Sequence, residues 1–115
     1  MGRSGELHLS KECSQYTGAA GDFCTITSSN VEEIVVGSRV VYQDAAGEGT
    51  LDTDIVLDAG SGNQAMGHVV LDLVSDKGVV TFSDGAGSLA GFNGHADVSA
   101  QADGTWRWEG TYSFD

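Results

Sequence analysis

Four charged side chains on two neighbouring predicted strands have residue types and spacing suited to acid–base chemistry. His95 and Asp97 lie two residues apart, as do Arg107 and Glu109, so each pair shares one face of its strand. Paired across a hairpin, they would form a cluster of general acid–base groups. The alternative is an exposed patch of ion pairs. We favour this alternative because the cluster faces away from the aromatic side chains, whereas a substrate binds in a concavity.

Two further polar patterns point less clearly to a site. His68 and Asp72 are four residues apart on one strand and therefore about 13 Å from each other, too far to touch. Asp52, Asp54 and Asp58 share a face and offer oxygen ligands, but calcium needs six to eight ligands, usually from a loop. The sequence shows no catalytic triad, phosphate-binding loop or dinucleotide fingerprint. We predict no metal site and no cofactor.

Aromatic side chains form the second candidate site. From residue 105 to 115 the chain alternates, so that Trp106, Trp108, Tyr112 and Phe114 share one face, as in a half-buried strand. An eight-stranded barrel is either filled by such side chains or holds one small ligand. Glycines at 94 and 110 would leave space beside the rings and favour a pocket. The predicted ligand-binding residues are Tyr42, Phe82, Phe92, Trp106, Trp108 and Tyr112.

Two tyrosines are the nearest candidate proton donors for chemistry in that pocket. Tyr42 and Tyr112 each carry a hydroxyl on an otherwise apolar face. The alternative for each is a core ring whose hydroxyl has found a hydrogen-bond partner.

Short alternating segments must position these groups. Segments rich in β-branched or aromatic residues, separated by breaks rich in Gly, Asp and Asn, predict seven or eight strands. These segments are 23–27, 38–43, 50–58, 66–74, 79–82, 89–100 and 105–114. Their apolar positions define one inward face and their acidic positions one wet face, which favours an all-β, closed antiparallel barrel over a sandwich. Residues 30–36 are the only candidate for a helical turn.

The length of 115 residues indicates one domain. We expect a polar lead-in over 1–21, with 1–5 interpreted as a vector-derived scar, and the barrel over 22–115. The net charge of -12 repels phosphate backbones and anionic lipids, which argues against nucleic-acid and membrane partners. Proline is absent, as expected for a closed sheet with few free edges.

Two cysteines, Cys13 and Cys24, flank a short polar loop. An even pair in a small acidic domain predicts a disulfide and an exported protein. The alternatives are two unrelated thiols, with Cys24 buried in a strand, and a cytoplasmic location.

A glycine pattern carries a family resemblance. The stretch from Gly87 to Gly94, Gly-Ser-Leu-Ala-Gly-Phe-Asn-Gly, resembles the Gly-x-Phe-x-Gly-x-x-Gly stretch of allene oxide cyclases and plant dirigent proteins. Segments 37–42 and 75–78 resemble an early strand and a turn of those proteins in the same order. The resemblance implies a calycin-like barrel of eight strands that often assembles as a trimer. It does not carry over the cyclase reaction, because 23–30 lacks the carboxylate of that family's first strand.

Two functions follow as expectations. The barrel would bind a small apolar molecule in the aromatic pocket and isomerise or cyclise it by confinement, without metal or organic cofactor. Alternatively, it would be a secreted, non-catalytic carrier of such a ligand. Either form would be compatible with a dimer or trimer.

Overall fold

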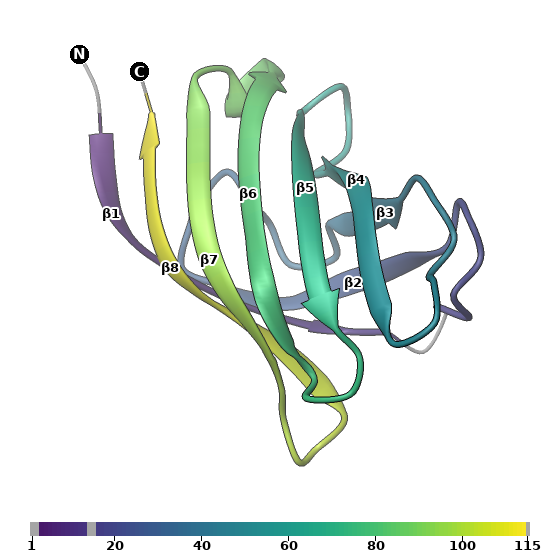
Figure 1. The fold of residues 1–115 in the computed structure, drawn as a ribbon. Helices are drawn as coiled ribbons and strands as arrows, with labels where there is room; N and C mark the ends of the chain where they lie inside the picture. Colours follow the sequence, from purple (N-terminus) through teal and green to yellow (C-terminus); the bar gives the residue numbers. More distant parts are fainter. Residues whose placement is uncertain (1–2, 14–15, 115) are drawn as a thin grey trace.

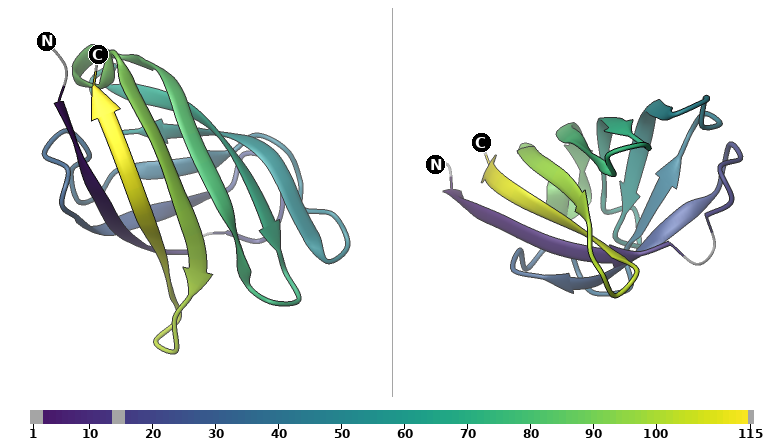
Figure 2. Two further views of the ribbon diagram at one scale, coloured as in Figure 1. Left: turned by 60° about the vertical axis from the view of Figure 1, so that its left-hand side comes forward. Right: turned by 60° about the horizontal axis from the view of Figure 1, so that its bottom comes forward.

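The computed structural model describes residues 3–13 and 16–114 and has the form of a closed barrel. Every strand pairs antiparallel with its neighbours in sequence, and the last strand pairs with the first (Figure 1). Figure 2 shows β2 and β3 crossing behind the longer strands β6, β7 and β8. The elements are β1 (Arg3–Glu12), β2 (Phe23–Ser29), β3 (Arg39–Tyr42), β4 (Thr50–Asp58), β5 (Gln64–Asp72), β6 (Lys77–Ala86), η1 (Gly87–Leu89), β7 (Phe92–Ala100) and β8 (Thr105–Phe114).

The predicted all-β, closed antiparallel barrel is confirmed. The seven predicted segments correspond to β2 through β8, and the segment 50–58 has the bounds of β4. Residues 30–36 form turns rather than a helical segment. The described residues contain no helix long and apolar enough to cross a membrane.

The first strand is the main correction to the sequence analysis. The predicted lead-in over 1–21 is wrong for residues 3–12, because these form β1 and pair with β8 from Arg3 opposite Phe114 to Glu12 opposite Thr105. The predicted scar over 1–5 includes residues 3–5 of that strand. Leu7 and Leu9 are buried on the inward side of β1, as alternation requires, but the next inward position is a lysine. Residues 1–2, 14–15 and 115 of the two predicted segments lie outside the described residues.

The inward face of the barrel is the hydrophobic core. Ile55, Leu57, Val80 and Ala96 are fully buried, and the acidic residues of the same strands are exposed. The predicted division into an apolar inner face and a wet outer face is therefore confirmed. The core fixes the direction of every side chain discussed below.

Candidate functional site

A row of aromatic rings, which we call the aromatic column, runs through the barrel. Phe114 packs against Phe92 with ring centroids 5.2 Å apart, Phe92 against Phe82 at 5.9 Å, and Phe82 against Trp108 at 5.3 Å. Tyr112 lies beside Phe92 and Phe114. These spacings are typical of tilted and edge-to-face aromatic pairs. The column joins five residues of β6, β7 and β8 into one apolar surface.

The two glycines beside the aromatic column, Gly94 and Gly110, do not leave open space. A Cβ added at Gly94 would meet the Phe92 ring at 3.2 Å and the Phe82 ring at 3.6 Å. One added at Gly110 would lie 1.9 Å from the carbonyl oxygen of His95. Rings and neighbouring backbone occupy these positions. The argument from glycine spacing to a pocket therefore fails, although the aromatic set itself is brought together.

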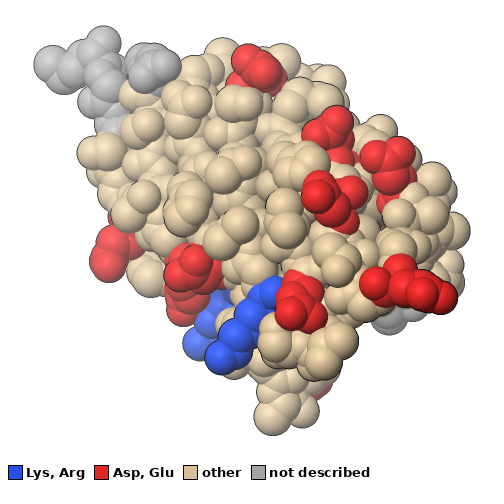
Figure 3. Space-filling model, in the orientation of Figure 1, with Lys and Arg blue, Asp and Glu red and all other residues tan. Residues whose placement is uncertain are grey.

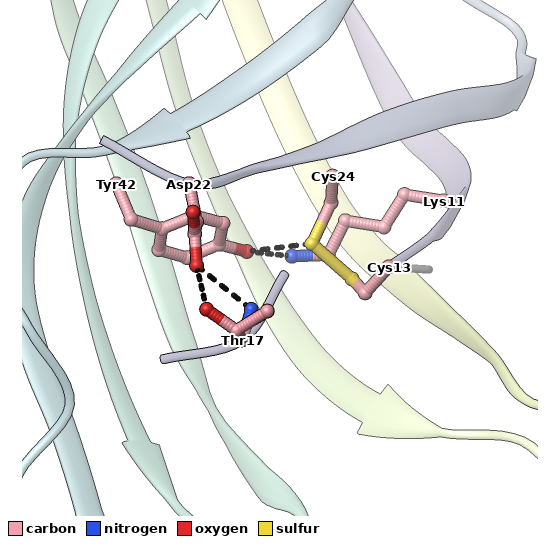
Figure 4. Close-up of a disulfide and its surroundings, with 6 residues drawn as sticks. All are labelled: Lys11, Cys13, Thr17, Asp22, Cys24 and Tyr42. Carbon is pink, nitrogen blue, oxygen red and sulfur yellow. Dashed lines mark hydrogen bonds between the residues drawn. A yellow bond between two sulfur atoms is a disulfide. The ribbon is translucent and has the colours of Figure 1, made fainter. Parts of the chain in front are cut away.

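Lys11 interrupts the aromatic surface at its other end, beyond Trp108. Its side chain points inward from β1 and is 4% exposed. The Nζ atom lies 4.7 Å from the centroid of the Trp108 ring and 5.1 Å from that of Tyr42, within cation–π range. It donates a hydrogen bond to the Tyr42 hydroxyl (Figure 4). Among residues 3–13 and 16–114, no salt bridge joins Lys11 to a carboxylate.

Burial shifts both members of this pair toward their neutral forms. Removal from water lowers the pKa of Lys11 from 10.5 to about 7. The same effect, with a smaller contribution from Tyr16, raises the pKa of Tyr42 well above its ordinary value. Near neutral pH the site thus contains an amine that is about half neutral and a protonated phenol, and their hydrogen bond joins a nucleophile to a proton donor.

The disulfide lies beside this pair. Cys13 and Cys24 are bonded to each other across 11 positions of the sequence, so the predicted disulfide is confirmed. The Sγ atom of Cys24 is 3.6 Å from the Tyr42 hydroxyl. Because a disulfide sulfur carries no proton, it can only accept from that hydroxyl. The bond is consistent with an oxidising compartment.

The segment closed by the disulfide is held onto Tyr42, and we call its described residues, 13 and 16–24, the strap. The ring of Tyr16 packs on that of Tyr42 with centroids 4.7 Å apart. The backbone N–H of Gly21 donates to the Tyr42 carbonyl at 2.7 Å. Within the strap, Asp22 accepts hydrogen bonds from the Thr17 hydroxyl and backbone N–H, which lower the pKa of that carboxyl. The strap therefore lies over Tyr42 at the Lys11 end of the barrel.

Two buried donors near Lys11 have no acceptor. Among the residues that the structure describes, neither the indole Nε1 of Trp108 nor the hydroxyl of Tyr16 has a hydrogen-bond partner. Buried polar groups are nearly always paired, and leaving one unpaired costs about 1–3 kcal/mol. Together with Lys11, they give this end of the interior three donor groups.

The structure places the predicted catalytic tyrosines apart. Tyr42 contacts Lys11 and Tyr16, whereas Tyr112 contacts Phe92 and Phe114. Trp106 is half-buried and opposes Lys11 in the β1–β8 register, so it flanks the amine. Lys11 itself was missed. Its only sequence signal was the alternation of Leu7, Leu9 and Lys11, which continues an inward face with a lysine.

The charged groups on the outer surface pair differently from the prediction. Glu109 binds the Nδ1 atom of His8, from β1, and lies 3.9 Å from Arg107. The hydrogen bond to Glu109 raises the pKa of His8. His95 lies opposite Thr111, not Glu109, in the β7–β8 register. The predicted acid–base cluster is thus an exposed ion-pair patch on β1 and β8.

His68 bridges two aspartates across β4 and β5. Its Nδ1 atom is 2.9 Å from Asp54 and its Nε2 atom 2.5 Å from Asp52. The hydrogen bond to Asp54 raises the pKa of His68 most; burial opposes it, and the hydrogen bond to Asp52 and the charges of both aspartates add to the rise. The carboxylates bind opposite ring nitrogens and do not converge on one point. Across the described part of the chain, no group of three or more His, Cys, Asp or Glu side chains is arranged to hold a metal ion.

Hollows on the outer wall are shallow and polar. One of about 310 Å³ is lined by His68, Asp54, Met66 and Ser83, and another of about 240 Å³ lies between His8 and Arg107. Figure 3 shows acidic side chains spread along the edges of the face formed by β5 to β8, with the middle of that face uncharged. Because these hollows are shallow and open to solvent, the interior pair at Lys11 is the stronger candidate site.

Comparison with known proteins adds no relative: no protein-family model, curated protein or solved structure matches this chain. The similarity to allene oxide cyclases and dirigent proteins remains a prediction from glycine spacing and strand order.

Proposed function

We propose that the barrel binds a small apolar molecule carrying one acceptor oxygen, a carbonyl or a carboxylate, beside Lys11. One observation carries the proposal: three buried donor groups, on Lys11, Trp108 and Tyr16, lie among aromatic rings, and the Tyr42 hydroxyl is their only hydrogen-bond partner among the described residues. Apolar ligand sites have this composition, with a few polar groups that orient the ligand.

The chemistry of the ligand follows from the donors. A ligand carboxylate would supply the negative charge that a buried, protonated Lys11 needs as a partner. A ligand carbonyl oxygen would accept a hydrogen bond from the Lys11 amine or from the Trp108 indole. The hydrocarbon part would lie against the aromatic column. Because Lys11, Tyr42 and Trp108 are buried, binding requires movement at the half-buried Trp106 and Tyr16, which lie at the Lys11 end.

Ligand carriage is supported better than catalysis. The two tyrosines expected to act as proton donors are separated, so they do not form one acid–base pair, and Tyr42 is the one that accepts a hydrogen bond from Lys11. Isomerisation or cyclisation by confinement remains the second expectation, with Tyr42 as the proton donor. The disulfide supports a secreted carrier. Analysis of the recovered ligand distinguishes the two functions, because a carrier returns its ligand unchanged.

Titration with cis-parinaric acid, a fluorescent apolar carboxylate, tests the proposal. Saturable binding is expected, with energy transfer from Trp108. Lys11→Met should weaken it about tenfold or more, since a hydrogen bond to a charged group is worth roughly 1.5–3 kcal/mol. Lys77→Met, at an exposed position, is the matched control. Equal affinity of the parent and Lys11→Met, or no saturable binding at all, would contradict the proposed site.

A further inference from the structure

We propose that Lys11 is a nucleophilic amine that forms a reversible imine with a small aromatic or apolar aldehyde, with Tyr42 transferring the proton. This inference rests on the proposed function, because the aldehyde must first bind in the interior. It goes further because it assigns a covalent step to Lys11, which in noncovalent carriage would serve only as a hydrogen-bond donor.

The geometry provides the two groups that imine formation needs. The Lys11 Nζ atom and the Tyr42 hydroxyl are hydrogen bonded, so an electrophile attacked by the amine comes within reach of a phenolic proton. The rings of Trp108 and Tyr42 fix the amine from two sides, at 4.7 Å and 5.1 Å. A flexible lysine is thereby held in one position, which lowers the entropic cost of reaction.

Burial also places the amine in its reactive form. Only a neutral amine has a lone pair for attack, and a lysine in water is almost entirely charged near neutral pH. The apolar surroundings of Lys11 lower its pKa to about 7, so about half of it is neutral there. Desolvation is a recognised way of activating a lysine nucleophile.

The reaction balances without a further reagent. The Lys11 nitrogen forms a bond to the aldehyde carbon, the C=O π bond breaks, and the oxygen takes one of the two protons of that nitrogen to give a carbinolamine. Tyr42 then protonates that hydroxyl, the C–O bond breaks, and water leaves. Loss of the remaining nitrogen proton, returned to Tyr42, gives the neutral imine. Both amine protons end in the released water, and no oxidant or reductant is consumed.

The two lysines of the chain allow an internal comparison. Lys11 is buried, whereas Lys77 is exposed at the start of β6. Incubation with benzaldehyde and sodium cyanoborohydride converts any imine into a stable benzylamine, and peptide mapping locates it. We expect Lys11 to be labelled about tenfold or more faster than Lys77 at neutral pH.

Three variants separate the steps. Lys11→Met should lose the label at this position, and Lys77→Met should keep it. Tyr42→Phe should slow labelling of Lys11 about tenfold or more, within the usual effect of a general acid. Labelling at Lys77 or the terminal amine alone, with cis-parinaric acid still bound, would overturn the imine and leave the proposed function standing. Loss of both labelling and parinarate binding would overturn both.

Discussion

Lys11→Met tests how the buried amine affects the stability of the barrel. In the folded protein, burial lowers the pKa of Lys11 from 10.5 to about 7. Between these values the unfolded chain binds more protons than the folded chain, so the free energy of unfolding rises with pH. One pKa unit corresponds to about 1.4 kcal/mol, and the full rise is therefore about 5 kcal/mol. This stability is fully present above pH 10.5 and is lost as the pH falls to about 7.

Titration of Tyr42 limits the pH range over which the stability of the barrel reports on Lys11 alone. Burial raises its pKa, so above about pH 10 the unfolded chain loses this proton first and stability falls again. From about pH 7 to about pH 9.5, the contribution of Lys11 alone is about 3 kcal/mol. Methionine has a similar length without an ionisable group, so it removes this contribution while filling most of the space. It also removes one hydrogen bond to Tyr42, worth about 1 kcal/mol.

Urea unfolding followed by tryptophan fluorescence at several pH values measures the effect. We expect the difference between the parent and Lys11→Met to shift by about 3 kcal/mol across the range, with Lys11→Met the more stable near pH 7. Lys77→Met should follow the parent. Other titrating groups are common to all three proteins and cancel in the difference. Parallel pH profiles for the parent and Lys11→Met would refute the reasoning.

Three further predictions concern the rest of the barrel. Replacing both cysteines by serine should lower the free energy of unfolding, measured in urea, by about 3 kcal/mol, because the disulfide joins residues 11 positions apart and restricts the unfolded chain. An unchanged urea midpoint would mean that other contacts hold the strap. Gly110→Ala should lower the free energy of unfolding by about 1–3 kcal/mol, because the added Cβ would collide with the neighbouring strand. Gly5→Ala, whose Cβ would lie 3.4 Å from the nearest atom, should leave it nearly unchanged. Equal effects of the two variants on the melting temperature would argue against close approach of the strands at Gly110. The titration midpoint of His68, measured by NMR, should lie above 6.5 and return toward 6.5 when both bound aspartates are replaced by asparagine. The interaction of His68 with these aspartates stabilises the fold below pH 6.5, and this contribution is lost as the pH rises through the pKa of His68 in the folded protein.

Much of the barrel follows from local sequence. Trp106, Trp108, Tyr112 and Phe114 predict the inward face of β8, because alternation with polar residues leaves only one side apolar. The acidic and glycine-rich breaks predict the hairpins for the same local reason. The disulfide also follows from composition, since two cysteines near each other in an acidic domain have few other roles.

What the sequence does not predict depends on contacts between distant residues. β1 was missed because Lys11 occupies an inward position that alternation assigns to an apolar residue, and only pairing with β8 shows that position to be buried. For the same reason His8, rather than His95, binds Glu109. The glycines of the aromatic column indicate close approach, but whether a ring, a backbone or a ligand approaches is decided by neighbouring strands.

Closure between β1 and β8 has a consequence for biosynthesis. The strands that seal the barrel lie at opposite ends of the sequence, so β1 leaves the ribosome long before its partner and is for that time an edge strand. Exposed edges recruit other chains, and a charge on the side destined for the interior opposes such recruitment. Before β8 pairs with β1, Lys11 is exposed to water and protonated. Once β8 has paired, burial lowers the pKa of Lys11 to about 7. We therefore expect the charge of Lys11 to oppose aggregation before the barrel closes, so Lys11→Met should aggregate more during refolding even where its native state is more stable.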